Sequence, residues 1–279
     1  MKFKKMHGAG NDYVFVDARN ETRDWPKVAA AVSDRHKGIG SDGLIILLPS
    51  EKADVRMQMF NADGSEGEMC GNGIRCFVRF ALDANALNLS DRPVRVETAA
   101  GILPVTPLWN GEFMTRASVS MGPPRLVPAD IPLVVEGEGP VIDHELEIAG
   151  QQIVFTGVSM GNPHAVTFID VDVEDYPLHE IGPIVESHSM FPNKVNFEIV
   201  NVLSRHRMKV RVWERGSGLT QACGTGACAV VVAARLKGLV SDNVTIDLPG
   251  GSLDIQWPGD GDVIMEGPVE ESFDGDWRG

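Results

Sequence analysis

Residues 60–73 read FNADGSEGEMCGNG, and residues 213–226 read WERGSGLTQACGTG. The two stretches align without a gap, and their cysteines, Cys70 and Cys223, are separated by 153 residues (223 − 70). Two further pairs keep nearly the same spacing, Asn11 with Asn162 (162 − 11 = 151) and Gly101 with Gly251 (251 − 101 = 150). Three landmarks in one order at nearly one spacing indicate an internal duplication, so we expect two homologous halves of about 130 to 150 residues each.

Each half shows the same local pattern, a strand before its cysteine and a helix after it. Residues 55–60 alternate apolar and polar side chains, which is the spacing of a half-buried strand. Residues 74–82 carry apolar side chains at helical spacing, and residues 227–234 are apolar nearly all round, which predicts a helix wrapped by sheet. The other β-rich runs are 13–16, 44–48, 94–98, 153–158, 166–169, 196–202, 208–214, 244–248 and 252–257.

This pattern predicts an α+β fold of two pseudo-symmetric halves, each a curved, mainly antiparallel sheet around a central helix. We expect residues 1–117 to form the N-terminal half and residues 118–264 the C-terminal half, with residues 265–279 returning to pack on the first. The proline-rich segment 123–132 is the best candidate linker. The active site is expected in the cleft between the halves.

The composition limits the classes of partner. Of the 279 residues, 43% are apolar and 23% are charged, which is typical of a globular protein. The formal charge of −14 would repel phosphate backbones and anionic lipids, so no nucleic acid or membrane is expected as a partner. No apolar run approaches the roughly 18 residues of a membrane span, and the basic start leads into no apolar signal-peptide core. We therefore expect a cytoplasmic protein, whose four cysteines are too few for a secreted disulfide scaffold.

A cysteine followed by Gly-x-Gly at the start of a helix has a specific chemistry. The first backbone N–H groups of a helix have no partner within the helix, and the helix dipole adds positive potential there. A carboxylate is therefore a natural occupant. The same potential predicts that the thiol pKa of Cys70 and of Cys223 is lowered toward neutral pH.

Two such elements in one chain favour one reaction in particular. Inverting a carbon stereocentre by proton transfer requires a base on one face and an acid on the other. The carbanion-like transition state of an amino acid also requires its carboxylate to be held by aligned dipoles. We expect Cys70 and Cys223 to supply both, one as a thiolate and the other as a thiol, with coupled titrations.

Other interpretations apply to the remaining side chains. Cys76 and Cys228, inside the predicted helices, are expected to be small buried apolar residues, and Arg75 to be solvated or salt-bridged. Four cysteines could bind zinc. However, at 3.6 residues per turn Cys76 and Cys228 lie about 240° and about 140° around their helices from Cys70 and Cys223, so the four sulfurs do not converge. A zinc-holding module and a thiol–disulfide oxidoreductase are the rival functions from other classes.

Several runs of the sequence together resemble the motifs of the diaminopimelate epimerase family. They are residues 3–12, 38–43, 60–75, 161–165, 195–197 and 213–227, and the similarity continues to residues 267–273. The resemblance implies conversion of LL- to meso-diaminopimelate in lysine and peptidoglycan precursor biosynthesis, by an isomerase without metal, pyridoxal phosphate or any other cofactor. It also implies a small-molecule substrate and a homodimer. Proline racemases and phenazine-biosynthesis isomerases share the fold and are the nearest alternatives.

The resemblance also implies roles for individual residues. Cys70 would be the proton donor and Cys223 the proton acceptor, labels that depend on the direction of the reaction. His164 and Glu214 would tune the thiols, and Phe273 would be an aromatic dimer contact. The residues that would bind the substrate are Asn11, Asn61, Gly71, Asn72, Asn162, Asn196, Glu214, Arg215, Gly224 and Thr225. Many family members carry a glutamine where this chain has Gly43, so one substrate contact is absent here.

Overall fold

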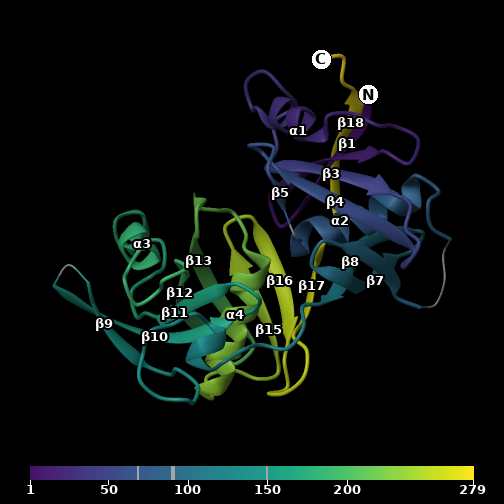
Figure 1. Cartoon of the computed structure of the whole chain (residues 1–279). Helices are drawn as coiled ribbons and strands as arrows, with labels where there is room; N and C mark the ends of the chain where they lie inside the picture. The colour runs from purple at the N-terminus through teal and green to yellow at the C-terminus, as the bar shows by residue number, and fades with distance from the viewer. Residues whose placement is uncertain (68, 89–91, 149) are drawn as a thin grey trace. The chain divides into compact units, whose positions relative to one another are not determined.

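The computed structural model describes residues 1–67, 69–88, 92–148 and 150–279. They form two compact units, one made of Met1–Ser120 with Glu266–Gly279 and the other of Met121–Met265 (Figure 1). Each unit is described by itself below. Among the described residues, no helix is long and apolar enough to cross a membrane.

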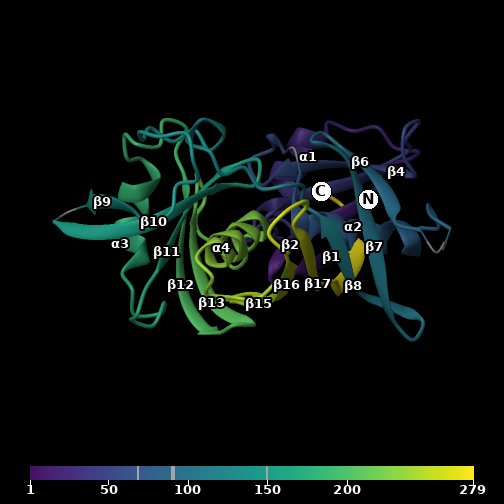
Figure 2. The same ribbon diagram turned by 90° about the horizontal axis from the view of Figure 1, so that it is seen from below.

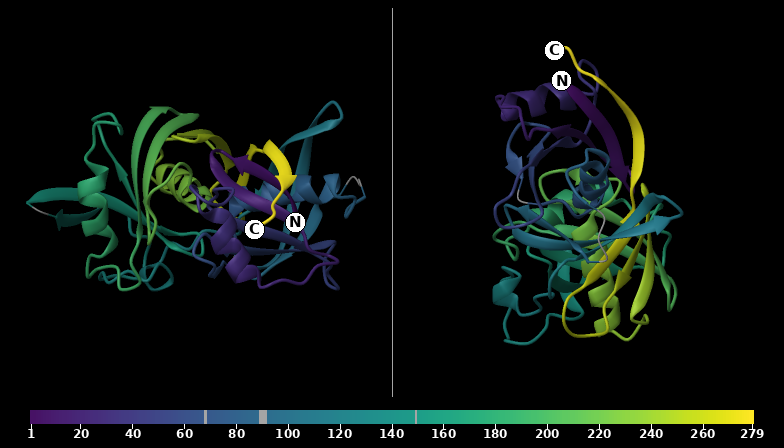
Figure 3. Two further views of the ribbon diagram at one scale, coloured as in Figure 1. Left: turned by 90° about the horizontal axis from the view of Figure 1, so that it is seen from above. Right: turned by 90° about the vertical axis from the view of Figure 1, so that its right-hand side faces the viewer.

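The first unit is a mixed sheet with two helices. In chain order its elements are β1 (Lys2–Gly8), β2 (Asn11–Asp17), α1 (Trp25–Ser33), β3 (Gly43–Leu48), β4 (Val55–Asn61), β5 (Glu66–Gly67), α2 (Gly71–Asp83), β6 (Val94–Thr98), β7 (Gly101–Asn110), β8 (Phe113–Ser120), and from the chain end β17 (Ile264–Pro268) and β18 (Glu270–Asp276). The strands pair in the order β18-β1-β2-β3-β4-β6-β7-β8. β17 pairs with β8, so the returning segment bonds to both ends of this sheet. Figure 3 shows β18 beside β1, with both chain termini at the same end.

The second unit repeats this plan. Its elements are the 3-10 turn Pro128–Asp130, β9 (His144–Ile148), β10 (Gln151–Ser159), β11 (Pro163–Phe168), α3 (Leu178–Glu186), β12 (Asn196–Ser204), β13 (Arg207–Glu214), β14 (Gly218–Leu219), α4 (Gly224–Leu236), β15 (Asn243–Leu248) and β16 (Gly251–Gln256). The strands pair in the order β9-β10-β11-β12-β13-β15-β16. Figure 2 shows α4 end-on, inside the curve of its strands.

The pairing directions confirm the duplicated α+β architecture. β2–β3 and β11–β12 are parallel, as are β4–β6 and β13–β15. The corresponding neighbouring pairs β3–β4, β6–β7, β12–β13 and β15–β16 are antiparallel. Two parallel strands require a crossover connection. The helices α1 and α3 lie in the first crossover of each unit, and α2 and α4 lie in the second. In both units, therefore, the helix in the second crossover has a cysteine as its N-cap.

The central helix α4 is buried, and most of its side chains are small and apolar. Residues Ala227–Ala234 of α4 are each 0% exposed, so this stretch of the helix is buried on every side. Such a helix is stable only when it is surrounded by other elements, and α4 contacts β10, β11, β12 and β16. In the first unit α2 contacts β1, β2, β3, β4, β7 and β8. The prediction that a helix wrapped by sheet follows Cys223 is confirmed.

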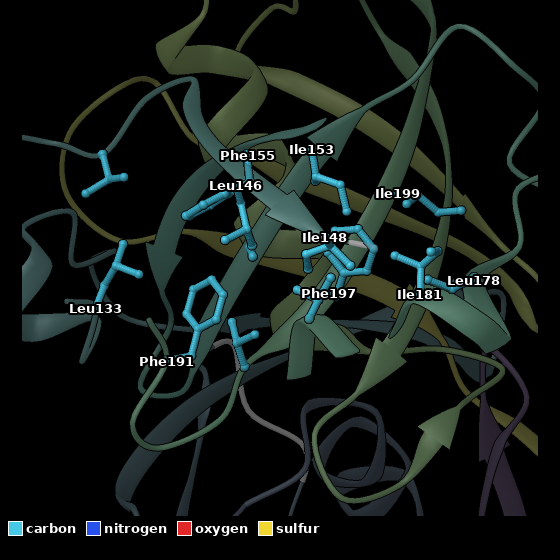
Figure 4. Packing of buried hydrophobic residues seen from close by; sticks show 14 of the residues in the cluster. Leu133, Leu146, Ile148, Ile153, Phe155, Leu178, Ile181, Phe191, Phe197 and Ile199 are labelled. Atoms are coloured by element: carbon cyan, nitrogen blue, oxygen red, sulfur yellow. The ribbon is translucent and has the colours of Figure 1, made fainter. Parts of the chain in front are cut away.

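A second apolar layer covers the other face of the sheet in the second unit. Leu178 and Ile181 of α3 pack there with Phe155, Phe191 and Phe197 (Figure 4). Ile131 and Leu133 belong to the same cluster and are 0% and 6% exposed. The segment 123–132 is therefore not a linker as predicted, because its apolar end contributes to this core. The chain passes from the first unit to the second at Ser120, the last residue of β8.

Candidate functional site

Cys70 is the N-cap of α2, and its sulfur is held by two neighbours. The sulfur accepts a hydrogen bond from the backbone N–H of Gly73 at 3.4 Å. The thiol in turn donates to the side-chain oxygen of Asn11, with 3.2 Å between the atoms. Asn11 is fixed in this orientation because its amide nitrogen donates to Asp42 at 2.6 Å. This orientation suits Cys70 in its protonated form.

Arg75, one turn into α2, differs from the sequence-based expectation. Its side chain is 0% exposed, so it is not solvated. The guanidinium donates to the carbonyl of Gly71 at 3.1 Å and to the side-chain oxygen of Asn72 at 2.9 Å. The Asn72 side chain is 2% exposed and is occupied by this contact. Asn72 can therefore face a ligand through its backbone more readily than through its side chain.

Cys223 is the N-cap of α4 and occupies the equivalent position in the second unit. Its sulfur accepts from the backbone N–H of Gly226 at 3.4 Å and lies 3.5 Å from the hydroxyl of Thr225. The side chain of Glu214, at the end of β13, also hydrogen-bonds the thiol. A second bond to that carboxylate comes from the Thr220 hydroxyl. Cys223 thus lies between a carboxylate and a helix N-terminus.

The thiol pKa values differ in direction from the sequence-based prediction. Burial raises the pKa of Cys70, and the hydrogen bond from Tyr13 and the backbone N–H of Gly73 offset this only in part. The pKa of Cys223 is raised well above its usual range, first by burial and then by the carboxylates of Glu214 and Glu198. The predicted lowering by the helix N-termini is wrong for this structure because desolvation of the thiolate is the larger effect. Burial therefore favours the neutral thiol form of both cysteines.

His164 lies in a buried cluster of the second unit. Its ring is 0% exposed, with Nδ1 2.7 Å from a carboxylate oxygen of Glu198 and Nε2 3.0 Å from the side-chain oxygen of Asn162. The amide nitrogen of Asn162 donates to Thr225 at 3.2 Å. The structure thus joins His164 to the residue beside Cys223.

Glu198 and Tyr13 are site residues that the sequence analysis missed. Glu198 is 0% exposed and Tyr13 is 7% exposed. Each lies in a strand among apolar residues, and nothing in the local sequence distinguishes it from an ordinary strand residue. For Glu198, its place directly after residues 195–197 was the available signal.

The remaining predicted binding residues lie at strand ends. Asn196 is 3% exposed; its amide nitrogen donates to the Pro163 carbonyl at 3.0 Å, and its oxygen accepts from the backbone N–H of Arg215 at 2.8 Å. The exposed guanidinium of Arg215 donates to the carbonyl of Asn193 at 3.0 Å. Asn61 is exposed and donates to Ser65 at 2.9 Å.

These residues gather at one edge of each sheet. Asn11 begins β2, and Gly43, the first residue of β3, pairs with Asn61, the last residue of β4. Asn162 directly precedes β11, whose His164 pairs with Asn196, the first residue of β12. The two edges correspond through the duplication, and each also carries a helix N-terminus with its cysteine.

Phe273 lies on β18, outside either cysteine cluster. It is 48% exposed and contacts Phe3 edge-on, with 6.0 Å between ring centroids. Cys76 and Cys228 are 1% and 0% exposed, which confirms them as buried residues. Within the described part of the chain, no group of three or more His, Cys, Asp or Glu residues is arranged to hold a metal ion.

Comparison with known proteins assigns the family. A model of the diaminopimelate epimerase family matches residues 3–127 and 156–271. The diaminopimelate epimerase of Desulfitobacterium hafniense is 48% identical over 279 residues, which is 99% of this chain and 97% of that protein. The chain belongs to the diaminopimelate epimerase family. The diaminopimelate epimerase of Methanococcus maripaludis is also 48% identical, over 99% of both chains.

Solved structures place the family within a wider fold. A phenazine biosynthesis protein of the PhzF family from Bacillus anthracis superposes with a TM-score of 0.71 over 99% of this chain and 98% of its own, at 16% identity. A hydroxyproline epimerase from Agrobacterium vitis superposes with a TM-score of 0.68 over 99% and 90%, at 15% identity. At these identities the likeness concerns the fold alone. It agrees with the predicted two-half architecture.

Proposed function

We propose that this protein interconverts LL- and meso-2,6-diaminopimelate by proton transfer between two cysteines, without metal or other cofactor. One sulfur removes the α-proton from one face of the carbon, and the other delivers a proton to the opposite face. The whole-length similarity to diaminopimelate epimerases supports the substrate. The observation that carries the mechanism is that both units present a cysteine as the N-cap of a buried helix.

The local contacts support different starting states for the two sulfurs. The Cys70 thiol donates to Asn11, so it begins protonated and acts as the proton donor. Cys223 lies beside the Glu214 carboxylate, which accepts its proton and so makes Cys223 the proton acceptor. Burial raises the pKa of Glu214, which brings this carboxyl closer to the pKa of a thiol. The labels reverse when the reaction runs backward.

The helix N-termini would stabilise the negative charge that develops when the α-proton is removed. The backbone N–H groups of Gly71, Asn72, Gly224 and Thr225 belong to the first turns of α2 and α4, where the helix dipole contributes positive potential. They would hold the reacting carboxylate while negative charge develops beside it. The exposed guanidinium of Arg215 would hold the distal carboxylate.

Arg215 also separates the proposed substrate from the rivals of the same fold. A proline-like substrate has one amino-acid end and leaves this guanidinium without a carboxylate. Asn11, Asn61, Asn162 and Asn196, with Glu214, would fix the distal ammonium and carboxylate in one configuration. A substrate with two amino-acid ends therefore supplies a carboxylate for Arg215 and an ammonium for Glu214, as well as the reacting carbon.

The decisive experiment is incubation of the reduced protein with LL-diaminopimelate in D₂O. We expect the meso isomer to appear together with deuterium at the α-carbon, measured by NMR and chiral chromatography. Turnover should be unaffected by a chelator, which separates the proposal from a zinc-dependent function. Retention of the α-proton under reducing conditions would exclude the mechanism.

The product would serve lysine and peptidoglycan precursor biosynthesis in the cytoplasm, and we propose that the active form is a homodimer. The exposed ring of Phe273 on β18 supports this assembly. Phe273→Ala should shift the protein toward monomer in light scattering. Phe113→Ala, which removes a ring that is 64% exposed on the β7–β8 hairpin, is the control and should leave the assembly unchanged. A monomeric native protein at micromolar concentration would contradict the proposal.

A further inference from the structure

A continuous chain of side chains leads from a buried carboxylate to the sulfur of Cys223. It starts at Glu198, whose carboxylate lies 2.7 Å from His164 Nδ1. The opposite ring nitrogen, Nε2, lies 3.0 Å from the side-chain oxygen of Asn162. The amide nitrogen of Asn162 donates to Thr225 at 3.2 Å, and the Thr225 hydroxyl lies 3.5 Å from the sulfur. All five residues belong to the second unit.

The contacts of the His164 ring fit one placement of its protons. Nδ1 faces a carboxylate oxygen of Glu198 and Nε2 faces the side-chain oxygen of Asn162, and both kinds of oxygen accept hydrogen bonds. This arrangement fits a ring that donates from both nitrogens. Because the Thr225 oxygen accepts from Asn162, its own hydrogen is free to point at Cys223. In this placement the chain ends in a hydroxyl that can donate to the sulfur.

A neutral His164 would reverse the direction of the hydrogen bonds between His164, Asn162 and Thr225. With its one proton on Nδ1 toward Glu198, the ring would accept at Nε2, and the Asn162 amide would have to turn over to donate there. The amide oxygen would then face Thr225 and take its hydroxyl hydrogen. The sulfur of Cys223 would lose its donor. The charge on His164 therefore decides whether Thr225 supports the thiolate.

We propose that Glu198 is a positioning residue that keeps His164 doubly protonated, so that Thr225 donates a hydrogen bond to the Cys223 thiolate. This inference concerns the site of the proposed function, but it is stated for the free protein and can be tested without substrate. A charge-assisted hydrogen bond to a thiolate stabilises the form that removes the α-proton.

Two observations argue that Glu198 is not present for packing alone. It is 0% exposed, and among the described residues its second carboxylate oxygen has no hydrogen-bond partner, which is costly for a buried acid. Gly226 also leaves room for it, since a Cβ at that position would lie 2.9 Å from a Glu198 oxygen. The second glycine of the Cys-Gly-Thr-Gly motif is thus explained by the carboxylate behind it.

Loss of the Glu198 charge has opposite effects on thiolate formation at Cys223 with and without the proposed chain of hydrogen bonds. Two ionisable groups act directly on Cys223, Glu214 from β13 and Glu198 from β12, and His164 from β11 acts on Glu214. Acting alone, the charge of Glu198 raises the pKa of the Cys223 thiol, so its simple removal would ease thiolate formation. In the proposed chain, removing it also discharges His164, and the loss of the Thr225 hydrogen bond makes thiolate formation harder.

The test measures the pH dependence of Cys223 alkylation by iodoacetamide in the Cys70→Ala background. Glu198→Gln keeps the shape of the side chain, and we expect roughly tenfold slower alkylation below the thiol pKa, the effect of one charge-assisted hydrogen bond. Thr225→Val should give the same slowing. The double variant should be no slower than either single variant, because both remove one interaction. Glu186→Gln, in a glutamate of α3 that binds Trp213 and Lys194, is the matched control and should have no effect.

The protonation of His164 is measured separately in the protein with its native Glu198. The ¹⁵N shifts of its ring should show two protonated nitrogens at neutral pH, and one in Glu198→Gln. Unchanged or faster alkylation in Glu198→Gln, additive effects in the double variant, or a neutral His164 in the native protein would each overturn the inference. Since none of these measurements involves diaminopimelate, such a result would leave the proposed epimerisation standing.

Discussion

Cys70, the N-cap of α2, and Cys76, inside the same helix, should respond to mutation in different ways. Cys70→Ala removes a proposed acid–base group, so we expect epimerisation to fall by roughly 10²–10⁴-fold or more, with little change in stability. Cys76 is 1% exposed. Cys76→Ala should keep activity but lower the free energy of unfolding by about 1 kcal/mol, the scale of one buried methylene. Deuterium exchange and urea unfolding measure the two effects, and substantial turnover in Cys70→Ala would contradict the assignment.

At the level of single residues, the sequence identified the chemistry but not the electrostatics. The duplicated Cys-Gly-x-Gly motif was enough to select Cys70 and Cys223 and to place each at a helix start. It could not show that burial outweighs the helix dipole, because the depth of a side chain depends on elements far away in sequence. The same limit applies to Arg75, which a helical wheel leaves on the surface but which the surrounding strands bury.

The helix α2 carries a thiol whose burial should be visible in the pH dependence of stability. Burial raises the pKa of Cys76 to about 12. The unfolded thiol ionises near 8.5, so the contribution of the neutral buried thiol is fully present below that pH and is lost as pH rises toward 12. The free energy of unfolding of the native protein should therefore fall relative to that of Cys76→Ala by about 1.4 kcal/mol per pH unit above pH 9, so that the variant becomes the more stable protein by about pH 10. Urea titrations from pH 8 to pH 10.5 measure it, and parallel curves would contradict the burial of this thiol.

The elements that the sequence predicted best are those with strong periodicity. The alternating run 55–60 became β4, and residues 208–214 became most of β13. The helices α1 and α3 were not predicted, since each spans only nine residues and α3 contains a proline. β7 was also missed as a strand, because two prolines and exposed residues hide its alternation. Short edge elements depend on pairing partners, and the sequence does not reveal these locally.

For the whole molecule, the proposed mechanism demands that both sulfurs reach one carbon. A reacting atom lies within about 3.5 Å of its partner, so the mechanism brings the sulfurs of Cys70 and Cys223 to about 7 Å of each other across the substrate. Without substrate between them, sulfurs that approach to the S–S bond length of about 2.05 Å can form a disulfide. We expect oxidised glutathione to produce a Cys70–Cys223 crosslink and to abolish activity, and dithiothreitol to restore it.

Peptide mapping without reduction identifies this crosslink, and the Cys76→Ala/Cys228→Ala variant should form it equally well because both of its missing thiols are buried. Two separate glutathione adducts on Cys70 and Cys223 of the same molecule, with no crosslink, would mean that the sulfurs do not approach one another. Such a result would rule out proton transfer across a single carbon even if each unit kept the geometry described here. The crosslink therefore tests the one requirement that neither unit can meet alone.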